Sequence, residues 1–146
     1  MKRIIALTLA LLSLFLMTSC EKVEYVTDVT YRIYENGSGK TKSDVIGFYS
    51  TAASNKDGVW EYSFADGKDI FEEFLSNSQS KESGMIDKLT IIYGTTVLKP
   101  KNEGKAKIAF DLKDESGNIK TTKYFEITSK KDKDGILRLS VEEIKE

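Results

Sequence analysis

The feature that most constrains this fold is a two-residue alternation of apolar and polar side chains, which recurs from residue 23 to residue 144. Tyr31 and Ile33, for example, alternate with Thr30 and Arg32. Because successive side chains of a β-strand point to opposite faces, the alternation predicts half-buried strands. They are predicted over residues 23–33, 45–50, 59–64, 89–98, 105–112, 119–127 and 136–144.

One segment departs from this alternation and predicts a helix. Its apolar residues fall at spacings of one, three and four, which forms a single apolar helical face: Ile70, Phe71, Phe74 and Leu75. Asp66 or Asp69 can cap its first turn, while Glu72 and Glu73 face water. Residues 77–84 are polar and predict a loop after the helix.

The predicted order is therefore β-β-β-α-β-β-β-β, in one domain covering residues 23–146. It indicates an α+β fold, in which an antiparallel sheet of about seven strands packs against the helix or curves around it. The alternative is a β-barrel or β-sandwich with the helix as a plug. That alternative is similar to lipocalin-like small lipoproteins in architecture alone, since the chain has no lipocalin motif.

The last three strands predict a register in which hydrophobic and charge patterns agree. Pairing Leu112 with Ile119 puts Asp111 opposite Lys120 on the outer face. The same register sets other pairs across the strands: Phe110 with Thr121, Ala106 with Phe125, Lys105 with Glu126, Ile127 with Leu137, and Glu126 with Arg138. Lys123 falls on the inward side, so we expect it near a sheet edge, where its amine can reach water.

The N-terminus has the pattern of a secretory signal peptide. Met1-Lys2-Arg3 precedes an apolar stretch over residues 4–17, and Thr18-Ser19-Cys20 follows. This junction resembles the lipobox of bacterial lipoproteins, with Met17 where that family usually has leucine. The resemblance implies removal of residues 1–19 and lipidation of Cys20, the only cysteine, so that residues 20–22 form a lipidated membrane anchor.

The residues after the cysteine bear on location. Glu21-Lys22-Val23-Glu24 resembles surface-export signals of Bacteroidota lipoproteins, and the mature domain resembles small envelope lipoproteins of that type, without one specific family. This implies a bacterial cell-envelope protein held at the outer membrane, on its periplasmic face or at the cell surface. Without Lys2 and Arg3 the formal net charge falls from −1 to −3, which gives no reason to expect nucleic-acid binding.

The composition excludes several kinds of active site. The chain has no histidine, which excludes Ser-His-Asp and Cys-His nucleophiles and the usual zinc and copper sites. Adjacent carboxylates occur at residues 72–73, 114–115 and 142–143, but neighbours in sequence point in different directions. We therefore expect no enzymatic activity and no cofactor.

Three short motifs have simpler interpretations than ligand binding. Asp132–Gly135 resembles the start of an EF-hand loop but lacks its later ligands, so it predicts a hairpin turn. Residues 37–41 lack the earlier glycine of a phosphate loop. The basic run of Lys99, Lys101, Lys105 and Lys107 is typical of a solvated strand edge, with contact to phosphates or an acidic glycan as the functional alternative.

Trp60, Tyr62 and Phe64 share one strand face and are the candidate ligand-facing aromatic residues. They could line a pocket or stack on sugar rings, although such a stripe more often forms core, here beneath Phe71 and Phe74. Together with the anchor, they favour a non-catalytic binding or accessory role toward a glycan, small ligand or protein partner. The alternative is a structural or assembly component of a larger envelope complex.

Overall fold

The computed structural model describes residues 26–39, 42–53, 57–83 and 90–145. Cys20 and the signal peptide lie outside these residues, as do residues 23–25 and Leu89 at the starts of two predicted strands. The described residues form eight strands and one 3-10 turn: β1 Asp28–Asn36, β2 Ser43–Ala53, β3 Val59–Asp66, η2 Lys68–Ile70, β4 Phe71–Ser83, β5 Thr90–Pro100, β6 Gly104–Lys113, β7 Ile119–Lys131 and β8 Leu137–Ile144.

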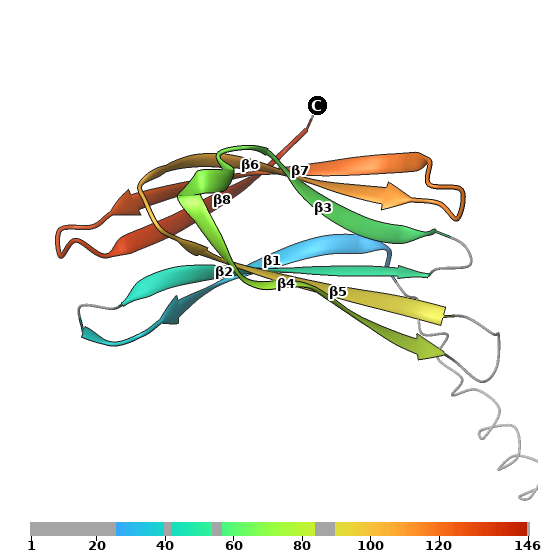
Figure 1. The fold of residues 1–146 in the computed structure, drawn as a ribbon, viewed down its shortest axis with the longest axis horizontal. Coiled ribbons are helices and arrows are strands. Elements are labelled where there is room, and N and C mark those ends of the chain that lie inside the picture. The colour runs from blue at the N-terminus through green and yellow to red at the C-terminus, as the bar shows by residue number, and fades with distance from the viewer. Residues whose placement is uncertain (1–25, 40–41, 54–56, 84–89, 146) are drawn as a thin grey trace, which may run out of the picture.

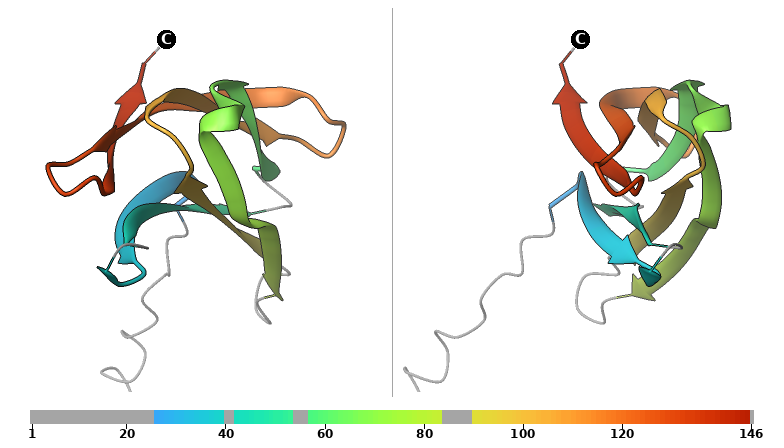
Figure 2. Two further views of the ribbon diagram at one scale, coloured as in Figure 1. Left: turned by 60° about the vertical axis from the view of Figure 1, so that its left-hand side comes forward. Right: turned by 90° about the vertical axis from the view of Figure 1, so that its left-hand side faces the viewer.

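The strands form two four-stranded sheets that face each other as two layers (Figure 1). Sheet A has the order β1-β2-β5-β4, and sheet B has the order β3-β6-β7-β8. Every neighbouring pair is antiparallel, which confirms the predicted strand direction. In the chain, β4 follows directly from η2. These two elements lie on one side of the molecule, whereas β1 and β8 lie on the opposite side (Figure 2).

The core consists of the inner faces of the two sheets packed on each other. Phe48 of β2 contacts Phe110 of β6 and Phe125 of β7, with ring centroids 5.1 Å and 5.2 Å away. Tyr31 of β1 meets the Phe125 ring edge-on at 5.8 Å. Because each buried aromatic ring removes roughly 150–250 Å² from water, this cluster supplies much of the force that joins the sheets.

The α+β prediction is wrong, because the structure is nearly all β and its described residues contain no helix of seven residues or more. The barrel alternative is wrong as well, since the sheets do not close into a barrel. The two facing sheets form a β-sandwich, as the other alternative has it, but the described residues contain no helix that could plug it. Gly67 has φ of 70°, and the single turn of η2 then gives way to extended backbone at Phe71. The polar loop predicted from residue 77 is strand as far as residue 83.

The helical spacing arose from an irregular edge strand. The pairing of β4 with β5 shifts between Glu73 and Leu75 and again between Leu75 and Ser78. These bulges interrupt the two-residue alternation, so apolar residues fall three and four apart without forming one face. Phe71 is buried, whereas Phe74 is 66% exposed and Leu75 is 44% exposed.

The predicted register is also wrong, by an even number of residues in each hairpin. Leu112 pairs with Thr121 rather than Ile119, and Ile127 pairs with Val141 rather than Leu137. An even shift leaves every side chain on its original face, so the hydrophobic pattern does not detect it. Glu126 consequently lies opposite Glu142 instead of Arg138, although a diagonal Lys105–Glu126 ion pair forms at 2.6 Å.

Two aspartates fix the hairpin turns of sheet B in the same way. Oδ1 of Asp132 accepts hydrogen bonds from the backbone N–H groups of Asp134 and Ile136, each at 2.9 Å. Asp114 does the same for residues 116 and 118. The segment that resembles an EF-hand start is thus a hairpin turn, with Gly135 at φ of 78°.

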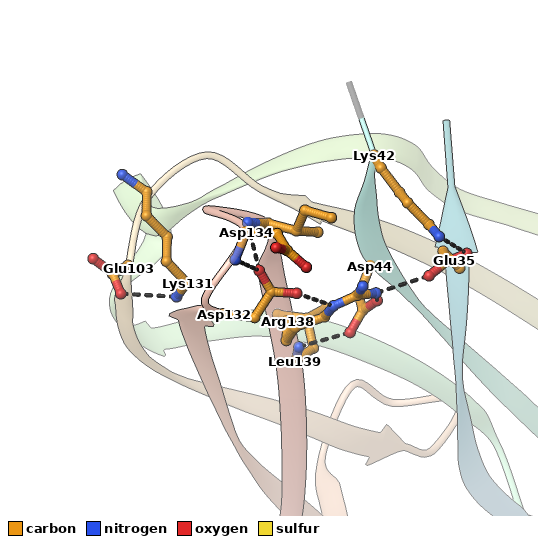
Figure 3. Close-up of polar contacts among 10 residues, drawn as sticks. Glu35, Lys42, Asp44, Glu103, Lys131, Asp132, Asp134, Arg138 and Leu139 are labelled. Carbon is orange, nitrogen blue, oxygen red and sulfur yellow. Dashed lines mark hydrogen bonds and ion pairs between the residues drawn. The ribbon is translucent and has the colours of Figure 1, made fainter. Parts of the chain in front are cut away.

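Ion pairs join the sheets along the side where β1 faces β8. Arg138 of β8 bonds Glu35 of β1 at 2.9 Å and Asp44 of β2 at 3.0 Å, and it also bonds Asp132 at 3.0 Å (Figure 3). The backbone N–H of Leu139 donates to the second oxygen of Asp44 at 2.9 Å. We call these residues the Arg138 clasp.

A second ion pair holds the other end of β1. Lys123 of β7 bonds Asp28 of β1, and it lies 3.6 Å from Glu143 of β8. Lys123 lies on β7, an inner strand of sheet B, and its amine reaches Asp28 and Glu143 on the edge strands β1 and β8. Both acidic residues of β1 that flank its middle, Asp28 and Glu35, are thus tied to sheet B.

The stability of the sandwich should depend on the phenylalanine cluster. We expect Phe125→Ala to lower the free energy of unfolding by about 3–5 kcal/mol, because Phe125 is fully buried and its loss leaves a cavity. The matched control Phe74→Ala should change it by no more than about 0.5 kcal/mol, since that ring is exposed. Denaturant unfolding measures both values. Equal losses in the two variants would contradict this core.

The Arg138 clasp should make the stability of the protein depend on pH in the acidic range. Hydrogen bonds from Lys42 and then Arg138 lower the pKa of Glu35, and those from Ile136 and then Arg138 lower the pKa of Asp132. A carboxyl whose pKa is lowered by folding stabilises the protein above its unfolded pKa, and this contribution is lost as pH falls through the folded pKa. Stability should therefore fall below about pH 5.

In Arg138→Gln, the free energy of unfolding should fall less steeply as the pH decreases. The reason is that the pKa values of the two carboxyl groups then return toward those of the unfolded chain. Lys130→Gln is the matched control, since it removes one positive charge from the residue paired with Arg138. The measurement is denaturant unfolding between about pH 6 and pH 3. If the free energy of unfolding falls with decreasing pH as steeply in Arg138→Gln as in Lys130→Gln, the clasp is refuted.

Candidate functional site

The aromatic residues predicted from the sequence lie on the inner face of β3. Trp60 is 5% exposed, and its Nε1 donates to the carbonyl of Thr51 in the opposite sheet at 3.2 Å. Tyr62 and Phe64 are half-buried and pack against the core. Burial, together with a hydrogen bond to Glu73, raises the pKa of Tyr62. Trp60 is therefore enclosed between the sheets, and Tyr62 and Phe64 are partly enclosed there as part of the core.

The predicted basic run does not form a single patch. Lys99 lies on β5 of sheet A, 3.6 Å from Glu72. Lys105 and Lys107 lie on β6 of sheet B, where Lys105 bonds Glu126 and Lys107 sits 4.3 Å from the centre of the Tyr124 ring. Each of these three amines therefore has a local partner, which is the pattern of a solvated sheet surface.

A hollow of about 320 Å³ lies on the outer face of sheet A, and its lining residues are Thr30, Arg32, Tyr34 and Tyr49. The first three are successive outward positions of β1, and Tyr49 comes from β2. The antiparallel register pairs Thr30 with Tyr49 and Arg32 with Gly47. Arg32 consequently occupies the middle of the hollow along β1. We call this region the tyrosine hollow.

Gly47 determines where the Tyr49 ring lies. A Cβ atom at position 47 would be 2.8 Å from Oη and 3.1 Å from Cζ of Tyr49, so the ring lies across the glycine. In that position the Tyr49 hydroxyl is 2.9 Å from the hydroxyl of Tyr34 and hydrogen-bonds to it. Glycine within a strand often marks such a close approach.

The electrostatics of the tyrosine hollow come from the two hydroxyls and one cation. The hydrogen bond to Tyr34, and then burial, raise the pKa of Tyr49, while the positive charge of Arg32 acts in the opposite direction. Tyr34 is 42% exposed, so part of its ring is open to a ligand. Among the residues that line the hollow, none is a carboxylate.

A second hollow of about 350 Å³ lies on the outer face of sheet B, and its lining residues are Lys105, Glu126, Thr128, Lys130, Arg138, Leu139, Ser140 and Glu142. Its charges largely neutralise one another. Lys105 bonds Glu126 at 2.6 Å, and Arg138 is occupied by three carboxylates of the clasp. The tyrosine hollow is the better candidate because its aromatic rings and its cation are not committed in this way.

The described residues contain neither a cluster of potential metal ligands nor a helix that could span a membrane. In the part of the chain that it describes, no three acidic, histidine or cysteine side chains are grouped so that they could hold a metal ion. Within that same part, no helix has the length and apolar character needed to cross a membrane. Cys20, the predicted lipidation site, lies outside the described residues.

Gly47→Ala should displace Tyr49 while leaving the fold intact. The new methyl group would overlap the free end of a flexible side chain, so the ring can swing away at little cost. We expect the Tyr34–Tyr49 hydrogen bond to break and the Tyr49 pKa to fall toward its ordinary value of about 10. Tyrosine-selective ¹³C NMR over pH 8–12 measures that pKa, and thermal unfolding checks the fold. An unchanged Tyr49 pKa would contradict the geometry.

The chain was compared with protein-family models, with curated proteins and with solved structures. None of these comparisons finds a match. We therefore infer the function from the residues of this chain and from their arrangement in the two sheets.

Proposed function

We propose that this protein is a lipid-anchored component of the bacterial cell envelope that binds a glycan without catalysis. The tyrosine hollow is the binding site in this proposal, and the exposed Tyr34–Tyr49 pair beside Arg32 is the observation that carries it. Lipid on Cys20 holds the domain to the outer membrane, at its periplasmic face or at the cell surface.

The chemistry of the tyrosine hollow suits a sugar ring. A pyranose has a flat apolar face of C–H groups and a rim of hydroxyls, so it needs an aromatic surface with hydrogen-bonding groups at its edge. Tyrosine combines both features in one rigid side chain. The hydroxyl of Thr30 adds a further donor and acceptor at the same hollow. A volume of about 320 Å³ is at the small end of the range for ligand sites.

The tyrosine hollow is poorly suited to hydrolysing the sugar it would bind. Glycosidases generally use two carboxyl groups, one on each side of the scissile bond. The four residues that line the hollow are a threonine, an arginine and two tyrosines. Binding without turnover is therefore the role that these side chains support.

The second candidate function is a structural or assembly role, and the edge strand β4 favours it. Phe74 and Leu75 are exposed on this strand, which pairs with β5 alone in sheet A. Exposed apolar residues beside an unpaired strand edge are a common docking surface for another protein. Crosslinking in cells with a photoreactive group at residue 74 tests this role, and recovery of the protein without any partner would refute it.

The anchor is tested by Cys20→Ala. We expect the wild-type protein to sediment with membranes and to carry a lipid mass on residue 20, because several acyl chains hold a protein stably to a bilayer. Cys20→Ala should lose the lipid mass and move to the soluble fraction. The measurements are fractionation and mass spectrometry of the N-terminal peptide. A wild-type protein without lipid would refute the anchor.

Glycan binding is tested with the lipidated protein, purified from membranes in detergent, on an array of neutral and acidic saccharides. We expect binding to at least one saccharide class and a loss of about tenfold or more in Tyr34→Ala and Tyr49→Ala. Tyr124→Ala is the matched control, because that tyrosine lies on sheet B. Absence of binding, or an equal loss in Tyr124→Ala, would overturn the proposed site.

A further inference from the structure

Resting on the proposed function, we propose that the tyrosine hollow selects a saccharide that carries a carboxylate, such as a uronic acid, and that Arg32 binds the carboxylate. Arg32 lines the hollow together with both tyrosines. The register places it opposite Gly47, in the gap that the Tyr49 ring bridges to reach Tyr34. A sugar stacked on these rings would therefore present its substituents to the guanidinium.

The pairing of charges around β1 leaves Arg32 available. The acidic residues of β1 point their charges to sheet B, where Asp28 bonds Lys123 and Glu35 bonds Arg138. Asp44, on the neighbouring strand, also bonds Arg138. Within the described part of the chain, Arg32 is exposed and has no ion-pair partner. It differs in this from Arg138, which has three carboxylate partners.

Arginine at this position favours a carboxylate over a hydroxyl. Its planar guanidinium presents parallel N–H groups that match the two oxygens of a carboxylate, and such charge-assisted hydrogen bonds are about twice as strong as neutral ones. The threonine and tyrosine hydroxyls of the hollow can bind the remaining sugar hydroxyls. The four lining residues thus supply a stacking surface, hydroxyl contacts and one anion contact.

The backbone argues against a free phosphate as the ligand. Phosphate sites usually include several backbone N–H groups that converge on the anion. Here the hollow lies on the face of a paired sheet, where the residues of β1 and β2 are in register from Asp28 to Asn36. Their backbone groups that face each other are used in the ladder. Side chains alone therefore form the site, and two of the four are aromatic.

The test compares two hexasaccharides that differ only in charge: hexagalacturonate and its fully methyl-esterified form. Isothermal titration calorimetry with the lipidated wild-type protein in detergent should show about tenfold or more tighter binding of the acid. Added salt should weaken that binding and leave the ester unaffected. Arg32→Gln should bind both forms equally, Arg32→Lys should keep part of the preference, and Lys130→Gln, a charge-matched control on sheet B, should keep all of it.

The outcomes separate this inference from the proposed function. Equal affinity of the wild type for both hexasaccharides, or an unchanged preference in Arg32→Gln, overturns carboxylate selection and leaves glycan binding standing. Tighter binding of hexaglutamate than of hexagalacturonate also overturns it, in favour of an acidic peptide. Binding of neither hexasaccharide overturns it as well, and the saccharide array then decides separately whether glycan binding survives. Thermal unfolding of each variant confirms that it is folded.

Discussion

The packing of Phe48 in sheet A against Phe110 and Phe125 in sheet B is the contact on which the rest of the structure depends. These rings lie 5.1–5.9 Å apart, and residues of both sheets complete the cluster around them. Rings packed at these distances leave no room for a ligand between them. The core also uses the inner-face aromatic residues of β3, including Trp60, which hydrogen-bonds across to sheet A. The proposed ligand site accordingly lies on an outer face of the sandwich and not between its sheets.

Ion pairs hold β1, the strand that supplies most of the tyrosine hollow, against sheet B. Lys123 and the Arg138 clasp bind β1 to sheet B near its two ends, through Asp28 and Glu35. Between these two attachments, Thr30, Arg32 and Tyr34 face outward into the hollow. An edge strand pairs with a neighbour on one side only, so such attachments limit its freedom to separate from the sheet. If Cys20 is anchored, eight residues of chain keep the start of β1 within roughly 28 Å of the bilayer. The proposed binding face would then stay near the membrane surface.

The sequence predicted the strands well because their half-buried faces impose a two-residue period, and β2, β3, β5, β6, β7 and β8 each contain a predicted strand or most of one. It failed where a bulged edge strand imitated a helix: Phe71 is buried and Phe74 is exposed, which no single helical face explains. The hairpin registers were missed because even shifts preserve the hydrophobic pattern. The tyrosine hollow was missed because Tyr34 and Tyr49 are 15 residues apart and meet only in the observed register. Gly47 within an apolar strand was the available signal, since such a glycine often marks a close approach.

In the proposed function, the ligand binds on the outer face of sheet A. The most direct measurement is an NMR titration of the ¹⁵N-labelled protein in detergent with hexagalacturonate, in which the backbone amide shifts are mapped onto the two sheets. We expect saturable shifts at residues 30–34 of β1 and 47–49 of β2, with the amides of β7 and β8 unchanged. Shifts centred on Thr128 and Ser140, which line the hollow of sheet B, would contradict binding at the tyrosine hollow, as would a spectrum that does not change.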